Sequence, residues 1–259
     1  MTSSRSRSLA ALLMVALVLV GAGAVGAESK PPASQAAVAA YREALSDWQA
    51  GHPQQALTGF ERAAQLAPHW GAPNARLGVI HQLQGREAEA REQYALTQEA
   101  SLDGPTPSAE DEAKLRPLIL ANEAYTVYLV NAARLQQGLL PLAPDPTLGI
   151  VARRHSEEMR DRRYFSHQSP TPGLTTCQDR FLAVFGYRPR LIGENVARRW
   201  GSLFCLTEEK ILGTHNDLMT SPGHRHNILL EEIEWLGVGI AANANGDYWL
   251  TEVFVEPGR

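Results

Sequence analysis

Apolar residues recur at helical spacing through the first half of the chain, in four segments that glycine or proline separates. This spacing predicts helices over 36–50, 53–66, 73–84 and 87–99. Gly51 and Gly85 fall between the members of each predicted pair, where a glycine turns the chain without strain. The first half is therefore expected to fold as two helical hairpins.

The hairpin segment repeats itself at a period of 34 residues. Each unit places an alanine four positions before an aromatic residue, which is Phe60 in the first unit and Tyr94 in the second. This period and pattern resemble tetratricopeptide repeats over 36–100. Because about three units are usually needed for a stable array, we expect 101–121 to supply a linker and a capping helix. The repeats would dock a protein partner or brace the second domain.

The second half alternates between helical and strand patterns. Helical spacing covers 123–137, 145–162, 208–220 and 225–230, whereas β-forming residues dominate 188–196, 233–242 and 247–255. Asn245 and Gly246 lie between the last two predicted strands and form a strong signal for a hairpin turn. Helices followed by antiparallel strands predict an α+β fold.

The N-terminus has the pattern of an export signal. Two arginines precede the apolar run 9–20, and the small residues that follow it end at Ala27. We therefore expect 1–27 to be a signal peptide, 28–35 to be a linker, and the mature protein to be periplasmic or extracellular. An uncleaved anchor is the alternative, although the glycines after the apolar run weaken the hydrophobicity that a membrane span needs.

Composition narrows the classes of partner. The 259 residues carry a net charge of −4 with a sequence pI near 6.1, which gives no reason to expect nucleic acid as a partner. No segment after the signal is apolar for long enough to span a bilayer. In an exported protein the two cysteines, Cys177 and Cys205, favour a disulfide, and two buried thiols are the alternative.

Three polar residues offer chemistry near neutral pH. His167 lies after a predicted helix, Glu194 near the end of a predicted strand, and His224 after a Ser-Pro-Gly turn. Each stands at a break in the chain, where side chains from distant segments can meet. Two imidazoles and a carboxylate can hold a divalent metal or transfer protons. Taken singly they have plainer explanations, such as a helix cap for His167, and His155 fits an ordinary polar position on a helix.

The neighbours of these residues form an ordered series of motifs. They include Phe165-Ser166-His167, Gly193-Glu194-Asn195 and Ser221-Pro222-Gly223-His224-Arg225, with further matches between 129 and 254. The series resembles the bacterial branch of the CAP superfamily, which includes cysteine-rich secretory proteins, antigen 5 and plant pathogenesis-related proteins. The resemblance covers roughly 125–255. It implies a CAP domain at 122–259, folded as an α-β-α sandwich with an antiparallel sheet, and it places the two histidines and Glu194 in one central cleft.

The chain departs from the family at a second carboxylate. Where many members carry a glutamate before the last histidine, this chain has Ser221. The candidates to replace that glutamate are Asp217, Glu208 and Glu209. Glu252 stands where the family often has glutamine. Two histidines and one carboxylate predict an open or weak site for Zn²⁺ or another divalent cation. The predicted ligands are His167, His224 and Glu194.

These observations lead to three hypotheses about function. The first is an exported binding module whose cleft takes a lipid, peptide or cell-wall ligand from outside the cytoplasm. The second is an extracytoplasmic hydrolase, either metal-assisted or built from Ser166 or Ser221 with a histidine and Glu194. The third is a polar network that only stabilises the fold. The family resemblance by itself does not separate them.

Overall fold

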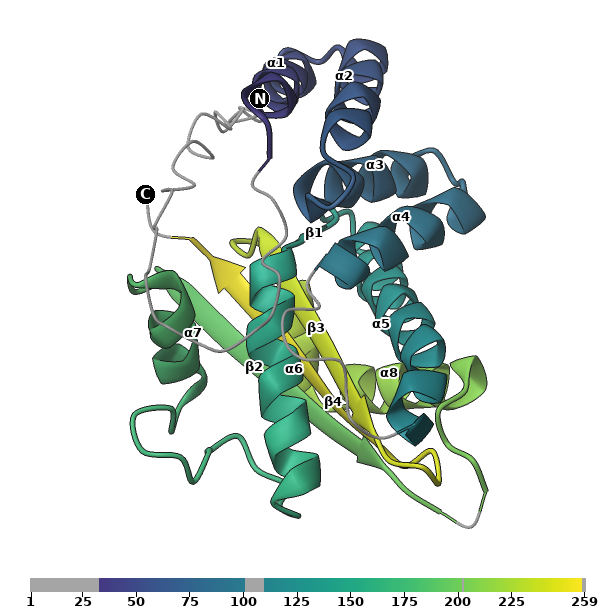
Figure 1. Cartoon of the computed structure of the whole chain (residues 1–259), viewed down its shortest axis with the longest axis vertical. Coiled ribbons are helices and arrows are strands. Elements are labelled where there is room, and N and C mark those ends of the chain that lie inside the picture. Colours follow the sequence, from purple (N-terminus) through teal and green to yellow (C-terminus); the bar gives the residue numbers. More distant parts are fainter. Residues whose placement is uncertain (1–32, 101–109, 202, 258–259) are drawn as a thin grey trace, which may run out of the picture.

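The structure is a computed structural model that describes residues 33–100, 110–201 and 203–257. The predicted signal peptide 1–27 and the predicted linker 101–108 lie outside the described residues. Helical hairpins lie at one end of the molecule, and a sheet flanked by helices forms the other (Figure 1). No described helix is both long enough and apolar enough to cross a bilayer.

The first four helices lie within two residues of their predicted bounds. They are α1 (Gln35–Gln49), α2 (Pro53–Leu66), α3 (Gly71–Leu83) and α4 (Glu87–Ala100). Gly51 and Gly85 adopt φ angles of 78° and 71°, so each turn uses a left-handed conformation that glycine tolerates. Phe60 and Tyr94 are fully buried. The hairpins are present as expected, while their assignment to tetratricopeptide repeats stays a prediction.

The predicted capping helix and the first helix of the second domain are one continuous helix, α5 (Glu110–Gln136). The expected break is wrong because no glycine or proline separates the two segments. Instead, the side chain of Asn122 donates a hydrogen bond back to Leu118 O at 2.8 Å and so remains part of the helix. Helix α5 therefore runs from the hairpins directly into the second half of the chain.

A buried chain of hydrogen bonds fixes α5 against the second hairpin. Tyr94 donates to Gln82 Oε1 at 2.8 Å, and Asn131 of α5 donates to the Tyr94 hydroxyl at 3.1 Å. The amide of Asn131 also exchanges two hydrogen bonds with the backbone of Leu142. One hydrophobic core extends from Tyr94 to Phe254, so the hairpins and the sheet are packed as one body.

The sheet has the order β1-β3-β4-β2. Its strands are β1 (Ala143–Pro144), β2 (Leu191–Arg199), β3 (Trp235–Ala242) and β4 (Tyr248–Glu256). The three long strands are antiparallel, but β1 pairs with β3 in parallel, so the sheet is mixed rather than purely antiparallel. Strand β2 begins three residues later than predicted and forms one edge of the sheet.

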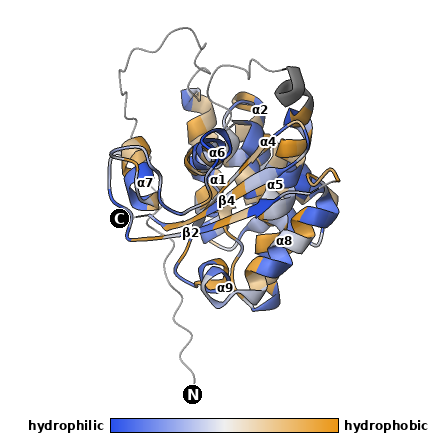
Figure 2. Ribbon diagram, turned by 90° about the horizontal axis from the view of Figure 1, so that it is seen from below, coloured by the Kyte–Doolittle hydropathy of each residue, from blue (hydrophilic) through white to orange (hydrophobic). Residues whose placement is uncertain are grey.

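Helices cover both faces of this sheet (Figure 2). On one face α6 (Pro146–Asp161) and α7 (Cys177–Phe185) pack on Val253 and Val255 of β4. On the other face α5, α8 (Glu208–Thr220) and α9 (Pro222–Leu229) pack on Leu250 and Phe254. The alternation of buried side chains along β4 separates the two faces. The predicted α+β fold with an α-β-α arrangement is confirmed.

Helix α6 lies unusually close to β3. A Cβ atom at Gly239 would lie 2.1 Å from the backbone nitrogen of Arg153, so only glycine permits this approach. The guanidinium of Arg153 then reaches Glu123 of α5, with Nη2 2.5 Å from Oε2. The N–H of Ile240 donates to the same carboxylate at 2.8 Å. Burial raises the pKa of Glu123, whereas Arg153 and the hydrogen bond from Ile240 act to lower it. This ion pair links α5, α6 and β3.

The predicted disulfide is wrong, because both cysteines are free. Cys177 begins α7 beside Glu194, and burial raises the pKa of its thiol. Cys205 is buried in the loop after β2, where its sulfur lies close to Gly201. The part of β2 from 194 to 199 alone spans about 17 Å of extended chain. That distance far exceeds the roughly 7 Å between Cα atoms that a disulfide tolerates.

Replacing Glu123 with glutamine should lower the free energy of unfolding by about 3 kcal/mol, because Arg153 would keep a buried charge without a carboxylate partner. Urea unfolding followed by circular dichroism measures this change. The exposed pair of Lys210 and Glu209 supplies the control, and Lys210→Gln should cost less than about 1 kcal/mol. Equal costs in the two variants would contradict the role given to the buried pair.

Candidate functional site

The structure brings His167, Glu194 and His224 together from three separate segments. His167 lies in the loop after α6, Glu194 is in β2, and His224 is in the first turn of α9. His167 Nδ1 lies 2.9 Å from Glu194 Oε1, and the centres of the two imidazole rings are 6.5 Å apart. Because β2 is an edge strand, loops from both faces of the sheet can meet beside it.

Glu194 is a buried carboxylate with a partner on each oxygen. His167 contacts Oε1, and the guanidinium of Arg180 forms an ion pair with Oε2. Burial raises the pKa of Glu194, but the hydrogen bond from His167 and the charge of Arg180 outweigh it and leave the pKa below its usual value. An ionised carboxylate only accepts hydrogen bonds. We therefore infer that His167 Nδ1 carries the proton and that Nε2 presents its lone pair to the cleft.

Arg180 is a partner of Glu194 that the sequence did not predict. Its Nη1 donates to the backbone oxygens of His167, Leu174 and Thr175 at 3.2–3.3 Å, so it also holds the loop that carries His167. It lies on α7, which was not predicted either. The signal was present: Thr176 and Asp179 form a capping box that starts the helix. An arginine one turn inside such a helix was a candidate partner for Glu194.

His224 is half-buried at the start of α9. Burial lowers the pKa of His224, and the nearby His167 lowers it further, so the neutral imidazole is favoured. The side chain of Asn195 donates to His224 O at 3.2 Å and holds the start of the helix against β2. Asn227 donates to Asn195 Oδ1 at 2.9 Å, in space that a Cβ atom at Gly193 would fill. The Gly193-Glu194-Asn195 motif thus forms contacts on both faces of β2.

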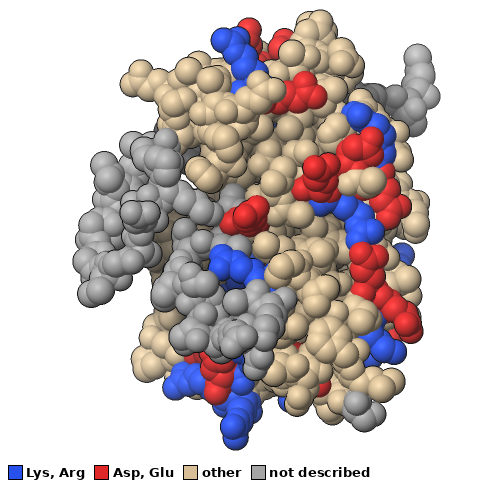
Figure 3. Space-filling model, turned by 45° about the vertical axis from the view of Figure 1, so that its right-hand side comes forward, with Lys and Arg blue, Asp and Glu red and all other residues tan. Residues whose placement is uncertain are grey.

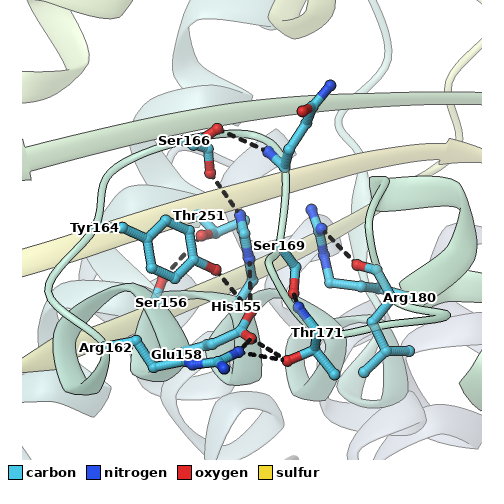
Figure 4. A network of polar contacts seen from close by, with 12 residues as sticks. His155, Ser156, Glu158, Arg162, Tyr164, Ser166, Ser169, Thr171, Arg180 and Thr251 are labelled. Atoms are coloured by element: carbon cyan, nitrogen blue, oxygen red, sulfur yellow. Dashed lines mark hydrogen bonds and ion pairs between the residues drawn. The ribbon is translucent and has the colours of Figure 1, made fainter.

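A second network anchors the loop of His167 to α6 (Figure 4). Glu158 accepts hydrogen bonds from Tyr164 at 2.6 Å, from Arg162 at 3.0 Å and from Thr171. Burial raises the pKa of Glu158, but these hydrogen bonds, together with one from Ser169, lower it to about 2. His155, which is almost fully buried, contacts the backbone oxygen of Ser166 at 3.0 Å. His155 is therefore a support for the loop and not a surface position.

Glu252 faces away from Glu194. It pairs in register with Asn195, whose side chain donates to it at 3.0 Å, and both point to the face that α9 covers. Burial raises the pKa of Glu252 to about 7, and its Oε1 has no hydrogen-bond partner among the described residues. The carboxyl group therefore changes charge near neutral pH beneath the cleft.

All three candidates for a second carboxylate ligand form ion pairs elsewhere. Asp217 pairs with Arg199, Glu208 with Arg91, and Glu209 with Lys210. Within the described ranges, no three histidine, cysteine or acidic side chains are arranged to hold a metal ion. Two imidazoles that share one tetrahedral ion lie roughly 5 Å apart between ring centres. The 6.5 Å between the ring centres of His167 and His224 is longer than that, so the two rings would have to move closer to share an ion, with Glu194 orienting His167.

The serines beside the histidines are not positioned as nucleophiles. Ser166 Oγ accepts a hydrogen bond from Gln168 N at 3.0 Å. Ser221 ends α8 and begins α9, and its side chain makes no capping hydrogen bond. Among the described hydrogen bonds, none joins the hydroxyl of either serine to an imidazole. A serine hydrolase needs a nucleophile within hydrogen-bonding reach of its base.

Comparisons with known proteins agree with the motifs. Residues 127–255 match the family described as "CAP: Cysteine-rich secretory protein family". The protein YkwD of Bacillus subtilis (strain 168), described as uncharacterized, is 37% identical over 137 residues, which are 53% of this chain and 48% of that protein. The membrane protein YlbC of the same organism, also described as uncharacterized, is 30% identical over 134 residues, or 52% and 36% of the two chains. The matches thus span about half or less of these relatives.

Two solved structures share part of the fold. An extracellular protein containing a SCP domain from Bacillus anthracis str. Ames has a TM-score of 0.47 and 30% identity, covering 60% of this chain and 45% of that one. An outer surface protein from Borrelia burgdorferi has a TM-score of 0.42 and 16% identity, covering 61% and 100%. Both similarities are modest in extent.

Glu158→Gln should remove a contribution to stability that is present at neutral pH and is lost at acidic pH. Because the folded pKa of about 2 lies below the ordinary 4.5, this contribution is present above about pH 4.5 and is lost as the pH falls towards 2. The difference in unfolding free energy between the wild-type chain and the variant should therefore shrink over that range. Denaturant titrations at several pH values measure it. Asp161→Asn, an exposed change on the same helix, should shift stability by less than about 0.5 kcal/mol.

Glu252→Gln should stabilise the protein above neutral pH. The folded pKa of about 7 lies above the ordinary 4.5, so the wild-type chain loses stability as the pH rises through this interval. Glutamine keeps an oxygen for Asn195 and carries no charge. The advantage of the variant should grow from pH 4.5 to 7 and reach up to roughly 3 kcal/mol. A difference that does not change with pH would contradict the assignment.

Proposed function

We propose that this chain, whose residues 127–255 belong to the CAP superfamily, is an exported protein that binds an envelope ligand in the cleft between His167 and His224. The ligand is a lipid, a peptide or a cell-wall component. The observation that carries this proposal is the meeting of two imidazoles from separate loops, one of them oriented by a buried carboxylate. Such pre-organisation reduces the entropy lost on binding.

Binding is favoured over acyl-transfer chemistry. Neither the hydroxyl of Ser166 nor that of Ser221 contacts an imidazole in the described hydrogen bonding, and Glu194 is paired with His167 and Arg180. A buried, fully paired carboxylate is suited to fixing the orientation of a histidine rather than to accepting a proton from water. The cleft therefore holds its imidazoles still while leaving their outer nitrogens available.

A divalent cation such as Zn²⁺ would draw these imidazoles closer together, since the 6.5 Å between their ring centres is longer than a shared tetrahedral ion needs. His167 would bind through Nε2 and His224 through a ring nitrogen, while Glu194 fixes the tautomer of His167. The lowered pKa of His224 favours the neutral form that a metal requires. When bound, the cation would supply a Lewis acid for an oxygen atom of the ligand. Two protein ligands make a weak site with positions left for that oxygen and for water.

The helical hairpins are proposed to dock a protein partner while bracing the CAP domain. Helix α5 is continuous between the two parts, so a partner held by the hairpins would be fixed relative to the cleft. On the face seen in Figure 3, acidic and basic side chains alternate rather than forming a stripe of one sign. Arg91 of α4 contacts Glu87, Glu208 and the ring of Tyr125. A mixed surface of this kind suits a protein rather than nucleic acid.

Calorimetry with Zn²⁺ tests the proposed metal site. The wild-type chain should bind one ion weakly, and His167→Ala/His224→Ala should show no binding heat. His226→Ala, an exposed histidine on the same helix, should bind like the wild-type chain. Glu194→Gln should weaken binding by about ten-fold to a hundred-fold, because it removes the group that orients His167. Binding should also weaken at acidic pH, where protons compete for the imidazoles.

Equal heats in the wild-type chain and the double variant would remove the metal from the proposal. The hydrolase alternative is tested separately, by incubating envelope polymers and peptides with the wild-type chain and with Glu194→Gln. Cleavage that disappears with the carboxylate would favour an enzyme. Absence of cleavage, with ligand binding that depends on His167 and His224, would support the binding function.

A further inference from the structure

Arg198 lies between two indole rings at the far end of β2. Its guanidinium carbon is 4.8 Å from the ring centre of Trp200 and 4.7 Å from that of Trp249. Trp249 is the cross-strand partner of Arg198 and is only 5% exposed, whereas Trp200 is 66% exposed. The stack fixes the plane of the guanidinium and holds an exposed indole against it.

The charge of Arg198 is not neutralised by any described side chain. The next residue shows the contrast, because Arg199 forms an ion pair with Asp217 and donates to Thr214 at 2.8 Å. Arg198 Nε is buried without a hydrogen-bond partner among the described residues. A guanidinium that is held flat, has spare donors and lacks a carboxylate is pre-organised for an anion.

Trp200 adds a flat apolar surface beside this cation. Exposing so much of an indole to water is unfavourable, since its large apolar ring gains by burial. The stacking on Arg198 holds the ring on one side, and the exposure of Trp200 leaves its other side open to a ligand. The apolar C–H face of a pyranose ring stacks well on an indole, and a negatively charged substituent on that sugar would reach the guanidinium alongside.

We propose that Arg198 and Trp200 form a subsite for a sugar ring that carries a carboxylate, as in an acidic polysaccharide. Arg198 lies four residues after Glu194 on the same face of β2, about 13 Å along the strand. One extended polymer could therefore contact both the subsite and the histidine cleft. Naming this ligand class makes the proposed binding function more specific. The subsite rests on the proposed function only in that one polymer would contact both sites.

A lipid bilayer is the competing partner for this surface. Leu203 and Phe204 lie close by and are 76% and 42% exposed, as expected of side chains that enter a membrane. However, Asp247 accepts a hydrogen bond from Gly201 N at 3.2 Å and places an acidic group in the same loop region. The chain also carries a net charge of −4. Both features disfavour an anionic bilayer, whereas a single sugar carboxylate needs only one arginine.

Calorimetry with a galacturonate hexamer, at low salt and in the absence of metal, tests the subsite. The wild-type chain should bind this probe and bind a neutral galactose hexamer at least about ten-fold more weakly. Arg198→Gln and Trp200→Ala should each weaken binding of the acidic probe by about ten-fold or more. Arg198→Lys keeps the charge but loses the planar stack, so it should restore only part of the affinity. Arg188→Gln, an exposed arginine elsewhere, should have no effect.

Two further measurements separate this proposal from its rivals. His167→Ala/His224→Ala should still bind the acidic hexamer more tightly than the neutral one, and adding Arg198→Gln to it should abolish that preference, so loss of the metal site and loss of the subsite are distinguishable. Sedimentation with phosphatidylglycerol vesicles should show no binding. The proposal is overturned if the wild-type chain does not bind the acidic hexamer, if Arg198→Gln leaves its affinity unchanged, or if vesicles bind in a manner that Leu203→Ala abolishes.

Discussion

A buried carboxylate on the edge strand is the constraint that positions His167 and the residues that support it. Glu194 cannot remain ionised beneath helices without cationic or hydrogen-bonding partners, because desolvation of a charge is costly. Arg180 and His167 meet that requirement, one on each oxygen. Each partner needs its own support: α7 presents Arg180, and Glu158 with His155 anchors the loop of His167. The orientation of the His167 imidazole thus follows from the need to stabilise the buried charge of Glu194 in β2.

The other buried carboxylates show how different partners lead to different behaviour. Glu123 faces Arg153 across α5, α6 and β3 and holds the hairpins' long helix to the sheet. Glu252 has only an amide from Asn195, so burial raises its pKa to about 7. Because Arg153 pairs with Glu123, that carboxylate is a structural link. Glu252 has no cationic partner among the described residues, so it is a group that titrates. Glu194 lies between these cases, since one partner is a fixed guanidinium and the other an imidazole that faces solvent.

The sequence predicted helices and strands more accurately than contacts between side chains. Helix spacing located the four hairpin helices within two residues, and ordered motifs identified the fold and the three residues that meet beside β2. The continuous helix α5 was missed because no local signal distinguishes a helix end from a helix that continues into a new domain. The disulfide was wrong for a related reason. Pairing Cys177 with Cys205 by number ignores the length of β2, which keeps them apart.

Arg180 and Arg198 show why charges on a sheet edge are hard to interpret from sequence. Both are arginines close to β2, yet one is buried against Glu194 and the other is held between indoles. Their environments depend on the register of β2 against β4, which places Glu194, Val196 and Arg198 on one face. A shift of one residue would turn all three to the opposite face. The register of one antiparallel pair therefore decides which side chains reach the cleft, which reach the indole stack, and whether a single ligand can contact both.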